Sequence, residues 1–273
     1  MADYVTPYMP IDPKGWRLAM GLRPLDEVKW LEVDENRTAE LELKDQLLRD
    51  AYDVVVATTP EGLEGSEELL ANVSDNLDQF HPGLSSHESS GEHPIVAASR
   101  LVQEDLCVLV RSDAWRLQAA CVCFPSRWNL ASKIGTTIDE IHRPVHRYDE
   151  QLAEPTNAVF ERMTSDRAFW RLNWTLINNP ALHLTAGASN TGDSSDLSEW
   201  FFRVERQTIR RLPFTGAIVF TIRTYVASAG SMCDGHDDFA ALLLNALDTT
   251  PLEMQDYKGW RGLATRLRSH LSN

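Results

Sequence analysis

The chain has 273 residues, of which 43% are hydrophobic and 24% charged, so it is long enough to bury one substantial core. Its formal net charge of -14 would repel the phosphates of DNA or RNA, which argues against a nucleic-acid partner. No apolar run approaches the roughly 18 residues needed to cross a bilayer, and the N-terminus lacks the basic start and apolar segment of a signal peptide. We therefore expect a soluble, cytoplasmic protein with no membrane partner.

Four cysteines are too few and too irregularly spaced for a disulfide framework. Cys121 and Cys123 would share one face of a strand, and buried free thiols are the simplest interpretation. A plant-type two-iron cluster needs four suitably spaced thiolates and cannot be built here, and no G-x-G-x-x-G turn indicates a nicotinamide site. Ser126 lacks the G-x-S-x-G turn of a serine hydrolase.

The first elements in chain order are predicted to be an arm and two helices. Prolines spaced along residues 1–37, among apolar anchors, indicate an extended arm laid over the rest. Apolar spacing predicts a helix over 38–50 and a second one that starts at Ser66 as its N-cap. The polar segment 81–93 predicts a loop; its three histidines recur every six residues, but no regular element would bring them together on a metal.

From about residue 106 the hydrophobic period changes to two, which is typical of strands. The predicted strands are 107–112 and 116–124, forming a hairpin, then 170–177, 200–208 and 217–226. Further predictions are a short helix ending at His142, helices over 156–164, 236–247 and 251–270, and a loop over 186–198. These elements predict an α+β fold with a mainly antiparallel sheet of about five strands and flanking helices. We expect 1–94 to form an N-terminal arm and helices packed on a core domain over 95–273, as one compact unit.

The most informative stretch is 121–146, CVCFPSRWNLASKIGTTIDEIHRPVH, which concentrates sulfur, aromatic rings, positive charge and two imidazoles. Thr137 or Thr136 can cap a short helix there, and Pro144 prevents its continuation. A histidine at that helix end, His142, is well placed to project one ring nitrogen as a metal ligand. Taken alone, however, a single histidine is more often an ordinary surface or core residue. The whole stretch suits a flat, anionic, metal-centred cofactor.

Charged residues also lie within two predicted central strands. Alternation along RVERQT puts Arg206 on one face and Arg203 with Glu205 on the other, where they could form a simple solvated surface. Arg223 lies between strongly apolar flanks, in line with Tyr225. A guanidinium there needs an anion, because an unpaired buried charge costs on the order of several kcal/mol. Either a carboxylate side chain or a cofactor carboxylate would serve.

Several long motifs in order resemble one family. They are MGLRPLDEVKWLE at 20–32, RLVQEDLCVL at 100–109, FPSRWNLASKIGTTIDEIHRPV at 124–145, WRLNWTL at 170–176 and RVERQTIRRLPFTGAIVFTIRTYV at 203–226. Over almost the entire chain, the sequence resembles the haem-dependent oxidative N-demethylases, specifically haem-bearing subunit-like proteins related to dimethylamine monooxygenase. The resemblance implies a PAS-like fold that holds haem b. It also implies that His142, in the I-H-x-P-V motif, is the axial iron ligand. The sequence departs from the family pattern at His146, where relatives more often have proline, and this second imidazole near the site is the alternative ligand.

The resemblance further implies a haem-dependent monooxygenase. Such an enzyme uses O2 to hydroxylate a methyl group beside the nitrogen of a small, dimethylamine-like amine, and the product collapses to the demethylated amine and formaldehyde. Catalytic candidates are Glu205, for cation binding or proton delivery, and Tyr225, whose ring offers an aromatic face to an ammonium group. Candidates for cofactor binding are His142, Arg127, Lys133, Arg206, Arg223 and Trp128.

Electrons would have to come from another protein, because this chain shows neither a cluster motif nor a dinucleotide fingerprint. The resemblance implies that they pass from NAD(P)H through a separate reductase with flavin and a two-iron cluster, and the acidic surface suits docking to a basic patch. The alternative function is a haem-binding PAS-like sensor or carrier without turnover. No output domain is evident in the sequence, which favours the enzyme. A third alternative is a family member that has lost haem and serves as a scaffold.

Overall fold

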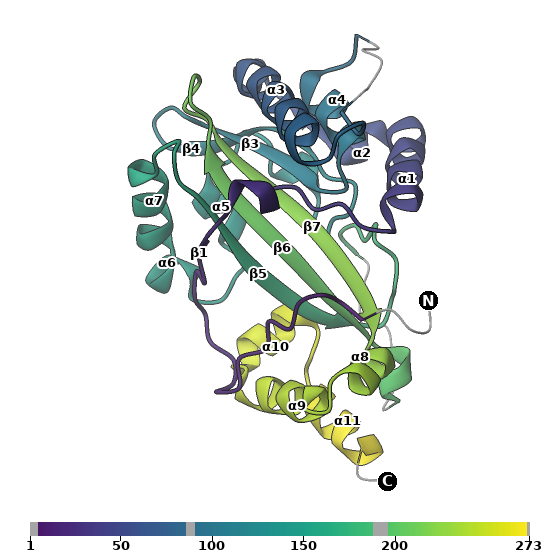
Figure 1. The fold of residues 1–273 in the computed structure, drawn as a ribbon. Helices are drawn as coiled ribbons and strands as arrows, with labels where there is room; N and C mark the ends of the chain where they lie inside the picture. Colours follow the sequence, from purple (N-terminus) through teal and green to yellow (C-terminus); the bar gives the residue numbers. More distant parts are fainter. Residues whose placement is uncertain (1–4, 86–90, 188–195, 272–273) are drawn as a thin grey trace.

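The computed structural model describes residues 5–85, 91–187 and 196–271. Its centre is one antiparallel sheet in which the strands follow the order β1-β5-β6-β7-β3-β4-β2 (Figure 1). The strands are β1 (Arg23–Pro24), β2 (Val56–Thr58), β3 (Asp105–Arg111), β4 (Trp115–Cys121), β5 (Ala168–Ile177), β6 (Phe201–Arg211) and β7 (Ile218–Ser228). The predicted antiparallel sheet flanked by helices is confirmed. The predicted number of five strands is too low, since the described residues form seven.

The two strands that the sequence did not predict are the outer ones. β1 pairs with β5, and β2 pairs with β4. With two and three residues, neither is long enough to show an alternating pattern. Because both belong to the segment 1–94, that segment contributes to the same sheet as the rest of the chain.

Eleven α-helices surround the sheet in the described part of the chain. They are α1 (Arg37–Asp50), α2 (Tyr52–Val55), α3 (Leu63–Phe80), α4 (Pro94–Leu101), α5 (Ile138–His142), α6 (Tyr148–Gln151), α7 (Ala153–Arg162), α8 (Ala229–Gly235), α9 (Phe239–Thr249), α10 (Leu252–Lys258) and α11 (Leu263–Leu271). None of them combines the length and apolar character that a membrane span requires, as far as residues 5–85, 91–187 and 196–271 are concerned.

Two predicted helices differ in detail from those observed. The single helix expected over 251–270 is two helices, because Gly259 and Gly262 adopt positive φ angles of 71° and 69° between them. The helix expected to begin at Ser66 begins at Leu63, and the Ser66 hydroxyl donates to the Gly62 carbonyl oxygen at 2.7 Å instead of capping the helix. The loops expected over 81–93 and 186–198 lie partly outside the described residues.

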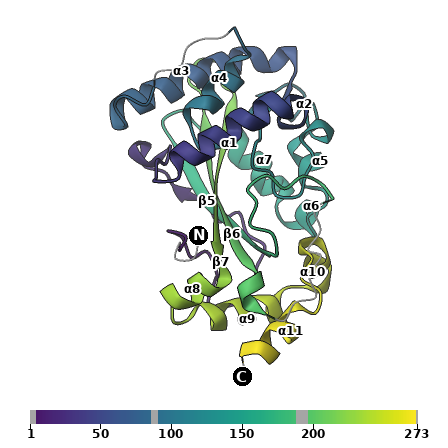
Figure 2. The same ribbon diagram turned by 90° about the vertical axis from the view of Figure 1, so that its right-hand side faces the viewer.

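Helices cover the two faces of the sheet unequally. One face, here called the covered face, includes Phe202, Val204 and Arg206 of β6 and is packed by α3 and α4 at one end and by α9 and α11 at the other. Helices α5, α6, α7 and α10 lie on the opposite side (Figure 2). There, apolar side chains pack in one cluster around Trp115, Phe160 and Ile209 and in a neighbouring cluster around Cys107 and Leu117, and Phe220 contacts both.

The middle of that second face, here called the open face, consists of half-buried side chains of three adjacent strands. They are Arg171 and Asn173 of β5, Glu205 and Gln207 of β6, and Phe220 and Ile222 of β7. β6 and β7 are interior strands of this antiparallel sheet, and one face of such a sheet can remain accessible to solvent. Charged, polar and apolar side chains that are only half-buried thus lie next to one another on this face.

Candidate functional site

His142 lies at the end of a helix that is fixed at both termini. The Thr137 hydroxyl accepts the Glu140 N–H at 3.2 Å, and the Glu140 carboxylate accepts the Thr137 N–H at 2.8 Å, which completes a capping box. The predicted Thr137 cap is therefore confirmed. Pro144 follows two residues after the last helical position. The sequence thus determines where His142 emerges.

The imidazole of His142 has a defined tautomer. Its Nδ1 lies 2.9 Å from the carbonyl oxygen of Ile138, and only an N–H can bond to a carbonyl, so Nδ1 carries the proton and Nε2 keeps its lone pair. The ring stacks on Tyr148 with a centroid distance of 4.9 Å and an interplanar angle of 14°. Burial lowers the pKa of His142, and the positive charges of Arg171 and Lys133 lower it further. A neutral, oriented imidazole is the form in which histidine binds a metal.

His146, the alternative ligand, is directed elsewhere. Its Nε2 lies 4.0 Å from a carboxylate oxygen of Glu253 in the first turn of α10. The side chain is half-buried. In this structure its ring therefore faces a carboxylate.

The segment that follows β4 carries Arg127 and Trp128, and its first residues are bound by the side chain of Asp105 in β3. Asp105, fully buried, accepts the N–H groups of Cys123 at 2.8 Å and Phe124 at 2.9 Å. Burial raises the pKa of Asp105 to about 6, so it remains mainly ionised at neutral pH. Its two acceptor oxygens fix the direction in which the chain leaves the sheet.

Arg203 of β6 binds the backbone of the same segment. Its guanidinium is fully buried and donates to the carbonyl oxygens of Phe124 at 2.6 Å and Leu182 at 3.1 Å, with longer bonds to those of Pro125 and Ala181. The solvated surface considered for Arg203 is therefore wrong. This arginine ties the segments 124–125 and 181–182 together beneath the open face.

Arg127 is positioned by backbone geometry and by α10. Its φ of 60° lies in the left-handed region, which is unfavourable for a non-glycine residue, and its N–H donates to the Leu184 carbonyl at 2.7 Å. Its guanidinium donates to the Lys258 carbonyl at 3.0 Å. Trp128 packs in the same apolar cluster as Ile141, the residue before His142. The two ends of the motif at 124–145 thus meet beside α5.

Lys133 lies close to the same helix end. Its Nζ donates to the Ile141 carbonyl at 3.4 Å. Its positive charge also helps to lower the pKa of His142.

Glu205, Arg171 and Lys258 form an electrostatically linked group on and beside the open face. The Glu205 carboxylate accepts from Gln207 at 2.9 Å and from Asn173 at 3.2 Å. The Lys258 amine donates to the Trp174 carbonyl at 2.8 Å. Burial lowers the pKa of Lys258 to about 8, an effect opposed by Glu205 and reinforced by Arg127 and Arg171. The group can hold an anion at Arg171 and a cation or proton at Glu205.

Arg171 is the member of this group without a bonding partner. Burial lowers its pKa, and the charge of Glu205 only partly offsets that effect. In the described part of the chain, no hydrogen bond or ion pair reaches its guanidinium, and its Nε is buried without an acceptor. A half-buried guanidinium without a hydrogen bond or ion pair is available to bind an anion.

Sequence reasoning missed Arg171 and Lys258. The sequence could have indicated Arg171, because this residue lies two positions before Asn173 in WRLNWTL and therefore shares a strand face with it. The sequence could not have indicated Lys258, since nothing in it shows that the end of α10 reaches β5.

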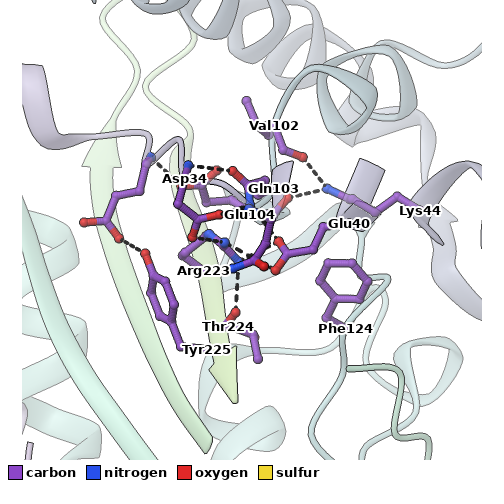
Figure 3. Close-up of polar contacts among 12 residues, drawn as sticks. Asp34, Glu40, Lys44, Val102, Gln103, Glu104, Phe124, Arg223, Thr224 and Tyr225 are labelled. Atoms are coloured by element: carbon purple, nitrogen blue, oxygen red, sulfur yellow. Dashed lines mark hydrogen bonds and ion pairs between the residues drawn. The ribbon is translucent and has the colours of Figure 1, made fainter. Parts of the chain in front are cut away.

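The remaining three candidates, Arg206, Arg223 and Tyr225, lie on the covered face, and Figure 3 shows Arg223 and Tyr225 with their partners. Arg223 forms ion pairs with Asp34 at 2.6 Å and Glu40 at 2.8 Å. Arg206 pairs with Glu32 at 3.2 Å, and the Tyr225 hydroxyl donates to the same carboxylate at 2.6 Å. The anion that Arg223 requires is therefore supplied by carboxylate side chains of the protein and not by a cofactor carboxylate.

The sheet therefore separates Arg206, Arg223 and Tyr225 from His142. Because side chains alternate along a strand, Arg206 points to the other face of the sheet from Glu205. In the same way, Arg223 and Tyr225 point to the other face from Ile222. The open face keeps five of the candidates close together or electrostatically linked, namely His142, Arg127, Trp128, Lys133 and Glu205.

All four cysteines are free, and Cys107, Cys121 and Cys123 are buried, as expected for structural thiols. Across the described ranges, no three His, Cys, Asp or Glu side chains gather in a way that could hold a metal ion. A porphyrin supplies its own equatorial nitrogens, so a single imidazole is enough to attach haem iron.

The comparison with known families agrees with this donor set. The model of the family "haem-dependent oxidative N-demethylase, alpha subunit-like" matches residues 21–267. The chain belongs to this family. The match confirms the family expected from the sequence and assigns a haem-dependent, oxidative N-demethylase-like function to a subunit-like chain.

Proposed function

We propose that this chain is the haem-bearing subunit of a monooxygenase that oxidatively demethylates a small, dimethylamine-like amine. The observation that carries the proposal is the neutral His142 ring, whose Nε2 lone pair is left available by the Nδ1 bond to Ile138. Family membership supports haem as the group that it binds.

The residues around His142 fit a haem group in three respects. The ring nitrogen provides one axial ligand. Arg171 lacks an anion, and together with Arg127 and Lys133 it would bind the two carboxylates of haem b. Phe220 and Ile222 are half-buried apolar side chains on interior strands, as a flat hydrophobic macrocycle requires.

The chain's own residues would prepare the amine for reaction. When bound, haem supplies the activation of O2 that hydroxylates the methyl group next to nitrogen. Glu205 is held by Asn173 and Gln207, and its carboxylate would attract the ammonium form of the amine or hold a proton. Lys258, with a pKa of about 8, exchanges its proton near neutral pH and would balance the charge of Glu205.

Several finer features belong to the same proposal. The fold around the haem is PAS-like, and the enzyme works in the cytoplasm with O2 and the amine as substrates. Electrons come from NAD(P)H through a separate reductase that carries flavin and an iron–sulfur cluster. The subunit-like character of the family supports dependence on other polypeptides. The release of formaldehyde follows from hydroxylation at the methyl carbon.

The proposal is tested by replacing His142 with Ala. We expect His142→Ala to lose iron coordination, seen as a lost or shifted Soret band and reduced haem content, because Ile138 has oriented that ring as the ligand. His146→Ala is the matched control and should keep the spectrum, because its ring faces Glu253. The opposite pattern would reassign the ligand to His146. If both variants kept iron coordination, neither histidine would be the ligand.

Turnover then separates the enzyme from a sensor or carrier. The purified chain with a reductase should consume oxygen and release formaldehyde only when the amine is present. Binding of carbon monoxide without any turnover over a panel of secondary and tertiary methylamines would contradict the enzymatic proposal and favour the sensor.

A further inference from the structure

Phe214 stands out on the surface far from the open face. It lies in the turn between β6 and β7, and its side chain is 91% exposed, the highest fraction among the large apolar side chains that the structure describes. Leu252, the next most exposed of them, reaches 56%. An isolated exposed apolar residue is ordinary, so the setting of the turn decides what Phe214 does.

The turn that carries Phe214 is held in one conformation. The Glu68 carboxylate of α3 accepts the N–H groups of Phe214 at 2.8 Å and Thr215 at 2.7 Å. The Leu212 N–H donates to the Ala217 carbonyl at 2.8 Å and closes the loop. An aromatic ring presented on a fixed backbone loses little conformational entropy when a partner covers it.

Close packing of α3 supports this arrangement. A Cβ atom at Gly65 would lie 3.2 Å from the Cβ of Ala217 and 2.8 Å from Val108, so glycine allows the helix to approach the β-strands. This approach brings Glu68 within reach of the turn.

The helix that contacts this turn is acidic. Helix α3 contains five acidic residues and neither lysine nor arginine. Glu64 and Glu67 are exposed and lie within about one helical turn of Glu68. The result is a rigid apolar knob with carboxylates beside it, defined here as Phe214 together with Glu64 and Glu67.

We propose that this knob anchors a partner subunit whose surface has an apolar socket with a lysine- or arginine-rich rim. Aromatic anchors in desolvated pockets dominate the energy of protein interfaces, and complementary charge around them speeds association. A second copy of this chain would bring the same carboxylates against themselves, and an anionic lipid surface would be repelled, so neither matches the charge. The subunit-like character of the family provides the context for a different polypeptide.

The test places a photo-crosslinking phenylalanine derivative at position 214 of the full chain in its source cells. We expect one polypeptide other than this chain to be crosslinked, and the same derivative at Leu252 not to capture it. That polypeptide is then purified, and its affinity for the chain is measured by calorimetry. Phe214→Ser should weaken binding by about 30-fold without altering the melting temperature, whereas Leu252→Ser should not weaken it.

Charge is tested in the same assay. Glu64→Lys with Glu67→Lys should also weaken binding, and added salt should weaken the wild-type complex. Crosslinking to a second copy, no crosslink at all, or equal binding by Phe214→Ser would each overturn the proposal. None of these readouts depends on haem, so the failure of this inference is distinguishable from the failure of the proposed function.

Discussion

Arg203 and Arg171 are two guanidinium groups on the same face of adjacent strands with opposite surroundings. Arg203 is fully buried and distributes its N–H groups over four carbonyl oxygens of two loop segments. Arg171 is half-buried and has no bonding partner among the described residues. At the scale of single residues, the first stabilises the scaffold, and the second is available to a ligand.

Replacing Arg203 with Met keeps most of the side-chain volume but leaves these carbonyl oxygens without a donor. We expect the free energy of unfolding, measured with urea, to fall by about 3 kcal/mol, because buried acceptors that lose their partners keep their desolvation cost. Arg111→Met is the control: Arg111 pairs with Glu161 on the surface and should contribute less than about 1 kcal/mol. Equal effects of the two substitutions would contradict the scaffold role of Arg203.

Among the elements, α3 shows how packing can override a local sequence signal. A serine followed by two glutamates indicates an N-terminus at Ser66, yet the helix begins at Leu63 after a short 3-10 turn over Pro60–Gly62. Gly62 fits there because a Cβ would lie 2.4 Å from the Gln118 carbonyl oxygen. The start of α3 is therefore set by contact with β4, a contact between residues far apart in the chain.

Gly65 provides the prediction for this element. Gly65→Val should lower the free energy of unfolding by about 2 kcal/mol, because the added side chain would overlap Val108 and Ala217 unless α3 moves away. Ala71→Val, at an exposed position of the same helix, controls for the lower helix propensity of valine and should cost well under about 1 kcal/mol. Urea titrations compare the pair. A Gly65→Val variant as stable as Ala71→Val would show that α3 is not held this closely.

For the whole molecule, periodicity predicted the central strands but not the assembly of the site. β5, β6 and β7 are long and alternate regularly, and Thr137 has a recognisable cap, so these elements follow from local chemistry. Alternation also separated Arg206 from Glu205. It could not show which side of the sheet faces His142, because that depends on where α5 and α10 pack. Nor could it show that residues 32–40 supply carboxylates to Arg223 and Arg206.

Under the proposed function, replacing an arginine on the open face should affect haemin binding, and replacing one on the covered face should affect stability. Arg171→Met removes a partly buried charge without a bonding partner and should not lower the free energy of unfolding of the haem-free chain, but should weaken haemin binding at least about tenfold. Arg206→Met leaves Glu32 without its ion pair and should cost about 3 kcal/mol while haemin affinity stays unchanged.

Soret titration gives the affinity, and urea unfolding of the haem-free chain gives the stability. Wild-type chain should also melt at a higher temperature with haemin present, because a ligand that binds only the folded state shifts the equilibrium toward it. That shift should shrink in Arg171→Met and persist in Arg206→Met. If Arg206→Met lost haemin affinity and Arg171→Met kept it, the haem would have to bind on the covered face, where Arg206, Arg223 and Tyr225 lie.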